Sequence, residues 1–229
     1  MIRFEDAGVT VDTPDGDLAI LEPTDLTLTE HRVGVIGANG SGKSTLARLV
    51  NGLAVATTGR VLVDDLDVAE HGREVRRRVG FVFSQPDAQL VMPTVVEDVS
   101  LSLRRSVKDR DERRARALEV LERIGLADRA DVTVHALSGG QKQLLALAGV
   151  LATEPDVVVA DEPTTLLDLR NTREVADQLF SMRQQLVLIT HDLDLAARCD
   201  RVVVVDAARV VFDGAPDAAV AHYRSLVSA

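Results

Sequence analysis

Residues 37–45 read Gly37-Ala38-Asn39-Gly40-Ser41-Gly42-Lys43-Ser44-Thr45 and fit the phosphate-loop pattern G-x-x-x-x-G-K-[ST]. An apolar run precedes them and a helical pattern begins near Lys43, which is the setting that this pattern requires. Glycines let the backbone curl so that its N–H groups face phosphate oxygens, and the helix start adds a positive end. The stretch from Asn39 onward is therefore expected to bind phosphates. Lys43 should contact the β- and γ-phosphates, Ser44 should bind Mg²⁺, and Thr45 should contact the α-phosphate.

Apolar runs outside this loop predict the sheet around it. Residues 33–36, 157–160, 186–190 and 202–205 are apolar throughout, which suits parallel strands covered on both faces. Helical stretches lie between them, so the fold class is α/β. Near the N-terminus, residues 2–11 and 19–29 resemble antiparallel strands joined by a turn at 13–16.

A helical stretch interrupts this alternation. Residues from about 99 to 149 are predicted to be mostly helical, with one helix over 109–124 that Gly125 stops. The 229 residues suit one domain with a sub-domain. We expect a single domain over 1–229, with a nucleotide-binding core at 1–84 and 150–229 and an inserted helical sub-domain at about 85–149.

Acidic residues follow one of the predicted strands directly. Asp161 and Glu162 come immediately after the run 157–160, so they should lie at the carboxyl edge of the sheet, where ligands of α/β proteins bind. Asp161 suits the Mg²⁺ site, and Glu162 suits the base that polarises the attacking water. His191 follows the run 186–190 and is expected to contact the γ-phosphate and this water. Lys43, Glu162 and His191 are thus the candidate catalytic residues.

Composition limits the possible partners. The net charge of −10 argues against nucleic-acid binding, and the basic stretches 73–78 and 104–116 are interpreted as solvated helix faces. No apolar run approaches the roughly 20 residues that span a bilayer, and the N-terminus has no signal pattern. Work at a membrane would therefore need a spanning partner. Cys199 is the one cysteine and is expected to be a small buried residue on a helix over 192–199.

The pentapeptide Leu137-Ser138-Gly139-Gly140-Gln141 lies between the phosphate loop and the acidic pair. In this order the three motifs resemble the ABC (ATP-binding cassette) ATPases along nearly the whole chain. The resemblance implies a P-loop NTPase fold of the ABC type with ATP and Mg²⁺ as ligands. It also implies that two copies enclose two ATP molecules. Ser138 and Gly140 of one copy would then face the γ-phosphate held by the other, and Asp168 would cross the same interface.

A narrower resemblance rests on residues 79–89, 93–99, 160–171 and 211–214. These stretches are similar to the ATPases of energy-coupling factor (ECF) transporters, and among them to those of biotin transporters. The resemblance implies import of a vitamin, with cobalt, nickel or another vitamin as the alternative cargo. It further implies a transmembrane coupling subunit, a substrate-binding membrane subunit and a cytoplasmic location at the inner face of the cell membrane.

Three positions depart from the family pattern. The family places a glutamine after the strand expected to end at Phe83, where this chain has Ser84 and then Gln85. Either Ser84 takes this position at the nucleotide and metal, or the loop re-aims Gln85 or Gln89. Residues 11–14 lack the aromatic side chain that stacks on adenine, which predicts weaker base discrimination. Leu144 stands where many relatives have arginine.

Other functions remain as alternatives. A non-transport ABC protein acting on ribosomes or DNA usually has two cassettes or long coiled-coil inserts, and neither is present. A small-molecule kinase would have no use for the pentapeptide. All hydrolytic residues are present in one chain, which favours a dimer of two identical copies over pairing with a paralogous ATPase.

Overall fold

The computed structural model describes residues 1–228, which fall into two units: residues 1–79 with the chain from 184 onward, and residues 80–183. The first unit contains β1 (Ile2–Thr13), β2 (Gly16–Leu28), β3 (Arg32–Ile36), α1 (Lys43–Val50), β4 (Thr58–Val63), β5 (Leu66–Asp67), α2 (Gly72–Arg78), β8 (Gln185–Ile189), α7 (Leu193–Ala196), β9 (Arg201–Asp206), β10 (Arg209–Gly214) and α8 (Pro216–Val227). The second contains most of β6 (Val79–Val82), then α3 (Val95–Leu103), α4 (Arg110–Arg123), α5 (Gly139–Leu151), β7 (Val157–Asp161) and α6 (Leu169–Ser181). The predicted boundaries of core and insert stay a prediction.

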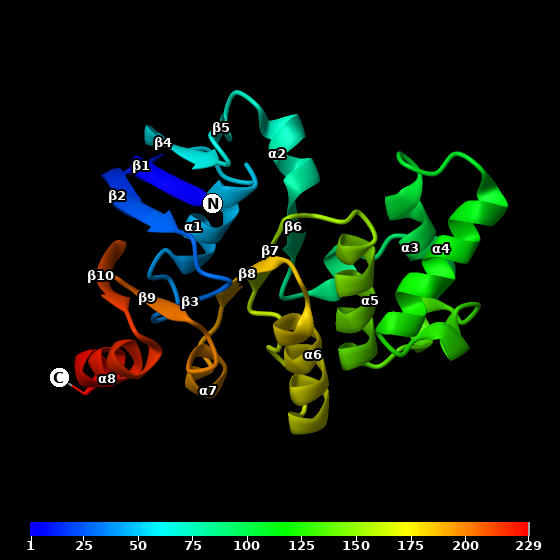
Figure 1. The fold of residues 1–229 in the computed structure, drawn as a ribbon. Coiled ribbons are helices and arrows are strands. Elements are labelled where there is room, and N and C mark those ends of the chain that lie inside the picture. The colour runs from blue at the N-terminus through cyan, green and yellow to red at the C-terminus, as the bar shows by residue number, and fades with distance from the viewer. Residues whose placement is uncertain (229) are drawn as a thin grey trace. The chain divides into compact units, whose positions relative to one another are not determined.

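The N-terminal strands form an antiparallel sheet in the order β2-β1-β4-β5 (Figure 1). Strands β1 and β2 pair from Ile2 opposite Leu28 to Thr13 opposite Gly16, so a two-residue turn joins them as predicted. The φ of 111° at Gly16 suits the glycine found there. Strands β4 and β5 lacked a clear apolar pattern and were not expected.

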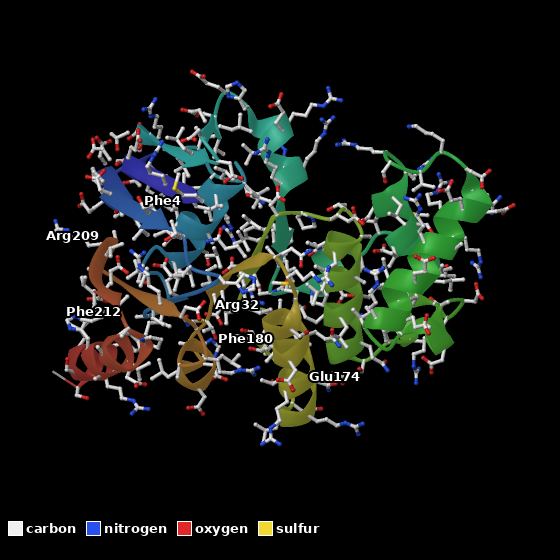
Figure 2. All side chains as sticks on the ribbon, viewed as in Figure 1. Phe4, Arg32, Glu174, Phe180, Arg209 and Phe212 are labelled. Atoms are coloured by element: carbon white, nitrogen blue, oxygen red, sulfur yellow. The ribbon has the colours of Figure 1, made fainter. Side chains whose placement is uncertain are left out.

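Strand β3 lies between β8 and β9 and pairs with both in parallel. Every residue of β3 is buried, as are most residues of its two neighbours, because both faces of these strands are covered. The strands predicted at 33–36, 186–190 and 202–205 and the α/β class are confirmed. Strand β10 pairs with β9 in antiparallel register. Phe212 of β10, labelled in Figure 2, stacks on His222 of α8 with ring centroids 5.1 Å apart.

An ion-pair network joins four segments of the first unit. The Arg201 guanidinium donates to Asp213 (Nε–Oδ1 2.6 Å), to both carboxylate oxygens of Glu30 (3.1 Å each) and to the Thr27 carbonyl (2.8 Å). Burial acts to raise the pKa of Glu30, but hydrogen bonds from the Glu30 and Thr29 backbone and from Arg201 outweigh it and lower this pKa. The hydrogen bond to Asp213 is the main cause that raises the pKa of Arg201. The network therefore ties the end of β2 to β9 and β10.

The second unit is mainly helical (Figure 1). Helix α4 begins after Asp109, whose carboxylate accepts from the N–H groups of Asp111 (3.0 Å) and Glu112 (2.9 Å). It ends before Gly125, which has a φ of 73°. Both ends of this helix were predicted correctly. Strand β7 confirms the run 157–160 and includes Asp161 as its last residue.

Two smaller predictions have different outcomes. Cys199 is buried, and burial raises the pKa of its thiol to about 12, which confirms a packed rather than reactive side chain. The helix expected over 192–199 is shorter, because α7 covers only Leu193–Ala196.

Within residues 1–228, no helix combines the length and the apolar character needed to cross a membrane.

Candidate nucleotide site

The phosphate loop follows β3 and leads into α1, as its sequence requires. Gly37 has a φ of 152°, and a Cβ at this position would collide with the Val205 carbonyl. Gly42 has a φ of 107°, and a Cβ there would lie 2.6 Å from the Ile20 carbonyl oxygen. Both glycines are therefore needed for two reasons, the left-handed backbone and the close packing on β9 and β2.

The side chains of the loop are arranged to receive an anion. Lys43 is 5% exposed, and its ammonium donates to the Ala38 carbonyl at 2.7 Å. Ser41 is equally buried, and its hydroxyl has no hydrogen-bond partner among the described residues. Helix α1 has no side-chain cap and no acidic residue in its first turn, so its N–H groups and positive end stay available. This donor set fits the phosphates of a nucleotide.

The turn between β9 and β10 is hydrogen-bonded to the backbone of the phosphate loop. The Ala208 N–H donates to the Ser41 carbonyl (3.0 Å), and the Ala208 carbonyl accepts from the Glu22 N–H (2.7 Å). Ala207 and Ala208 have φ values of 43° and 65°, which close a two-residue turn between β9 and β10. Sequence reasoning missed this contact because alanine is not typical of left-handed turns. The two-residue spacing between the flanking strands was the available signal.

His191 lies at the same edge as the phosphate loop. It follows β8, which runs parallel to β3, and the Thr190 N–H donates to the Val35 carbonyl at 3.1 Å. The His191 side chain is exposed. The predicted neighbourhood of loop and histidine is therefore present within the first unit.

The acidic pair belongs to the second unit. Asp161 ends β7 and is 5% exposed. Glu162 has a φ of 52°, its backbone carbonyl accepts from the Thr165 N–H (3.2 Å), and its carboxylate accepts from the Thr165 hydroxyl (3.3 Å). A glutamate in the left-handed region is uncommon, and such residues concentrate at functional sites. The turn thus fixes the direction of the Glu162 side chain.

The pentapeptide forms the start of α5. Ser138 caps this helix: its hydroxyl accepts from the Gln141 N–H (3.3 Å), and the Gln141 side chain accepts from the Ser138 N–H (3.0 Å). Ser138 and Gly139 are exposed, and the first turn of α5 has no acidic residue. An anion can therefore reach this helix end from solvent.

Asn171 connects the pentapeptide to Asp168. A Cβ on Gly140 would collide with the Asn171 side-chain oxygen, so only glycine fits beside it. The Asn171 side chain and backbone N–H each donate to the Asp168 carboxylate at 2.8 Å. Leu166 and Leu169 flank this aspartate and are 93% and 78% exposed. Ser138 and Asp168 are thus exposed beside the buried Gly140, on a surface with an unusually exposed apolar pair.

The loop after β6 differs from the prediction in two details. The strand ends at Val82 rather than at Phe83. The Gln89 side chain is already engaged, because it accepts from the Phe83 N–H (3.3 Å) and donates to the Ala146 carbonyl (3.4 Å). Ser84 is half-buried and Gln85 is exposed. The geometry therefore argues against Gln89 as the residue that takes the family's glutamine position.

Sequence reasoning overlooked Gln143. It is 1% exposed and donates to the Phe83 carbonyl at 2.9 Å, so α5 holds the residue just before Ser84. The Lys142 ammonium forms an ion pair with the Asp87 carboxylate (Nζ–Oδ1 2.7 Å), which is a second contact between α5 and the loop after β6. The neighbouring Leu144 is 2% exposed, which explains why an apolar side chain is suitable there.

Comparison with protein families settles the membership. A family model described as ABC transporter matches residues 21–165, which is more than half of the chain. The chain belongs to the ABC transporter family. It is an ATP-binding cassette and an ATPase.

Curated relatives of this cassette are ATP-binding subunits. A putative ABC transporter ATP-binding protein of Deinococcus radiodurans is 49% identical over 91% of this chain and 92% of its own length. The biotin transport ATP-binding protein BioM of Rhizobium etli is 42% identical over 99% of both chains. The methionine import ATP-binding protein MetN of Caulobacter vibrioides is 41% identical over 97% of this chain and 69% of its own length.

Solved structures agree with this assignment. The cassette resembles CbiO1 of Clostridium perfringens, part of the ABC transporter complex CbiONQ, with a TM-score of 0.85 and 32% identity over 99% of this chain and 93% of that one. It also resembles the cassette MJ0796, solved as a dimer with ADP and phosphate, with a TM-score of 0.84 and 28% identity over 94% and 99% of the two chains. The ABC-type fold is confirmed, whereas the roles assigned to single residues stay predictions.

Proposed function

We propose that this cassette is the ATPase of an ECF-type importer and energises uptake of the vitamin biotin. The observation that carries the proposal is the solvent-exposed surface around Ser138 and Asp168, with the exposed Leu166 and Leu169 beside it. A second copy of the cassette would place its ATP there. Likeness to BioM over the full length supports the biotin system, and the likeness to CbiO1 supports the ECF class.

The proposed reaction is in-line attack of water on the γ-phosphate. Lys43 and the loop N–H groups hold the phosphates, while Ser44 and Asp161 supply the hard oxygen donors that suit Mg²⁺. When bound, Mg²⁺ would neutralise charge that develops on the phosphate oxygens. Glu162 accepts the proton of the attacking water, and His191 orients the γ-phosphate. The γ-phosphate leaves as inorganic phosphate, and ADP keeps the bridging oxygen.

The proposed dimer switches with the γ-phosphate. Ser138 and Gly140 of one copy bind the γ-phosphate held by the other, so neither copy completes a site alone. Hydrolysis removes this bridge and lets the dimer open. The exposed leucines beside Asp168 would become covered in the closed state. Identical copies suffice, although a paralogous partner would use the same surfaces.

The loop from Phe83 to Gln89 is the proposed link to the membrane subunits. Because Gln143 and Lys142 tie this loop to the first turns of α5, movement of the loop would move the adjoining pentapeptide at the start of that helix. We assign the glutamine position to Ser84. Ser84→Ala should lower partner-stimulated ATPase activity by about 2- to 10-fold, as for the loss of one hydrogen bond. Gln85→Ala should leave it unchanged, and the reverse pattern would reassign the role to Gln85.

The importer assignment is tested with the membrane complex. The cassette would be purified from membranes together with its transmembrane partners, the bound vitamin or metal identified, and uptake measured in proteoliposomes with and without ATP. ATP-dependent biotin accumulation is expected, with the Glu162→Gln complex as the inactive control. Accumulation of methionine, cobalt or nickel would reject biotin. Absence of any membrane partner, together with binding to ribosomes, would reject the importer assignment itself.

A further inference from the structure

Two stretches that are distant in sequence meet in the surface around the pentapeptide. The pentapeptide opens α5, Asp168 directly precedes α6, and these two helices pack side by side in the second unit (Figure 1). A Cβ on Gly139 would lie 3.4 Å from the Leu167 side chain, and a Cβ on Gly140 would collide with the Asn171 side chain. Both glycines therefore let the segment around Asp168 pack directly on the start of α5.

Asn171 fixes the direction of the Asp168 carboxylate. Its backbone N–H donates to one carboxylate oxygen and its side-chain amide donates to the other, each at 2.8 Å. Asp109 and Asp192 also cap helices, but each uses a single oxygen, Oδ1, for two backbone N–H groups. Within residues 1–228, no further group hydrogen-bonds to the Asp168 carboxylate. Its orientation thus depends on Asn171 alone.

The Asn171 amide contacts two elements of this surface at once. Its nitrogen donates to Asp168, while its oxygen is the atom that a Cβ on Gly140 would meet first. The side chain is half-buried. Because one rigid amide group makes both contacts, a shift of either element changes the contact with the other.

We propose that Asn171 is a positioning residue, which holds the pentapeptide and Asp168 as one preformed surface for the second copy of the cassette. Asn171 acts through Asp168 and Gly140, and it has no part in holding the nucleotide of its own chain. Ordering of side chains on association costs affinity, so a surface that is ordered beforehand binds its partner more tightly. The inference rests on the proposed dimer and adds the residue that prepares its surface.

The test measures self-association and nucleotide binding separately in the Glu162→Gln chain, in which the ATP-bound dimer should persist. Light scattering reports ATP-driven self-association, and calorimetry on dilute protein reports ATP affinity. Asn171→Ala should weaken self-association about 5- to 30-fold, the loss expected for one hydrogen bond to a partly exposed charged group. ATP affinity should stay within about twofold.

Gln178→Ala is the matched control, and it should change neither quantity. Gln178 is a half-buried amide on the same face of α6, two helical turns after Asn171. Among residues 1–228, its side chain has no hydrogen-bond partner, so its removal tests the loss of an amide that positions nothing.

Asn171→Asp separates positioning from packing, because it keeps the size of the side chain and replaces the N–H donor by a carboxylate oxygen. Two carboxylates this close repel each other, whereas a proton shared between them restores a hydrogen bond. Self-association relative to the Glu162→Gln parent should therefore be lowest at about pH 8 and rise several-fold toward about pH 5.5. The relative value for Asn171→Ala should not change with pH.

Two results would overturn the role of Asn171 and leave the dimer intact. One is self-association of Asn171→Ala equal to that of its parent, and the other is a relative self-association of Asn171→Asp that does not depend on pH. A loss of ATP affinity as large as the loss of self-association would also reject positioning, because the fold itself would then be disturbed. If the Glu162→Gln parent does not self-associate with ATP at all, the proposed dimer fails and this inference fails with it.

Discussion

Two helix starts in this cassette carry anion-binding motifs, and they are built in different ways. At α1, Lys43 is almost fully buried, and neighbouring strands and the Ala208 turn hold the glycine loop before it. At α5, Ser138 is exposed, and the nearby Leu166 is 93% exposed. Both helices lack acidic residues in the first turn, so both keep a positive end. The phosphate loop is held in place entirely by its own chain, whereas the start of α5 is a surface open to a partner.

The largest expected effect separates binding from hydrolysis. Glu162→Gln should lower turnover by about 10²–10⁴-fold, because it removes the proposed proton acceptor, while ATP still binds at the phosphate loop. Phosphate release and ATP affinity would be measured side by side. Glu154→Gln is the matched control, since Glu154 is exposed and has a similar φ of 51° before β7. Turnover near the wild-type rate would reject Glu162 as the base.

A substitution in the phosphate loop tests how strongly the loop depends on its packing against β9. Gly37→Ala should cost about 3–5 kcal/mol of stability and abolish ATP binding, because the added methyl group meets the Val205 carbonyl. Gly16→Ala has a similar backbone strain, with a φ of 111°, but open space around it. It should cost only about 1–2 kcal/mol. Equal losses in denaturant unfolding would show that packing on β9 is unimportant.

The corresponding substitution at α5 should spare nucleotide binding. Gly140→Ala displaces Asn171 and with it Asp168, so ATP-driven self-association and turnover should fall by about 10²-fold. ATP affinity of the isolated chain should stay within about twofold. Light scattering with the Glu162→Gln background would report the dimer. Because the Asn171 Cβ would itself lie 2.7 Å from the added methyl group, Asn171→Gly is the change that makes room. In the Asn171→Gly background Gly140→Ala should add little further loss, and a full further loss would contradict the steric explanation.

The smallest expected effect concerns the ion pair between Glu30 and Arg201. The pKa of Glu30 is lowered in the folded chain, so its contribution to stability is present above its unfolded pKa and is lost as pH falls. Glu30→Gln should lower the free energy of unfolding at pH 7 by less than about 1 kcal/mol, as is usual for partly exposed pairs. The difference from wild type should shrink as the pH falls through the lowered pKa of Glu30. A difference that persists in acid would assign the effect to packing.

Local sequence rules accounted for most of the framework. Apolar runs located the parallel strands, the turn at 13–16 fixed the first hairpin, and Asp109 with Gly125 bounded α4. Strand β4 escaped prediction because its first three residues are exposed and its pattern is neither alternating nor apolar throughout. Its position depends on pairing with β1, which is a contact distant in sequence.

The same limit applies to the candidate site. Motifs placed Lys43 and Ser138 at helix starts, because a short pattern fixes both backbone and side chain there. The contacts of Gln143 with Phe83 and of Ala208 with Ser41 join residues far apart in the chain, and no local pattern encodes them.

The alanine turn between β9 and β10 has a practical consequence for altering this protein. Because the Ala208 backbone is hydrogen-bonded to Ser41 and Glu22, the chain length at this turn is fixed by a loop more than 160 residues earlier. A reporter peptide or an affinity tag inserted between Ala207 and Ala208 would pull on the phosphate loop directly. The exposed turn at residues 104–106, between α3 and α4, is a better place to lengthen the chain.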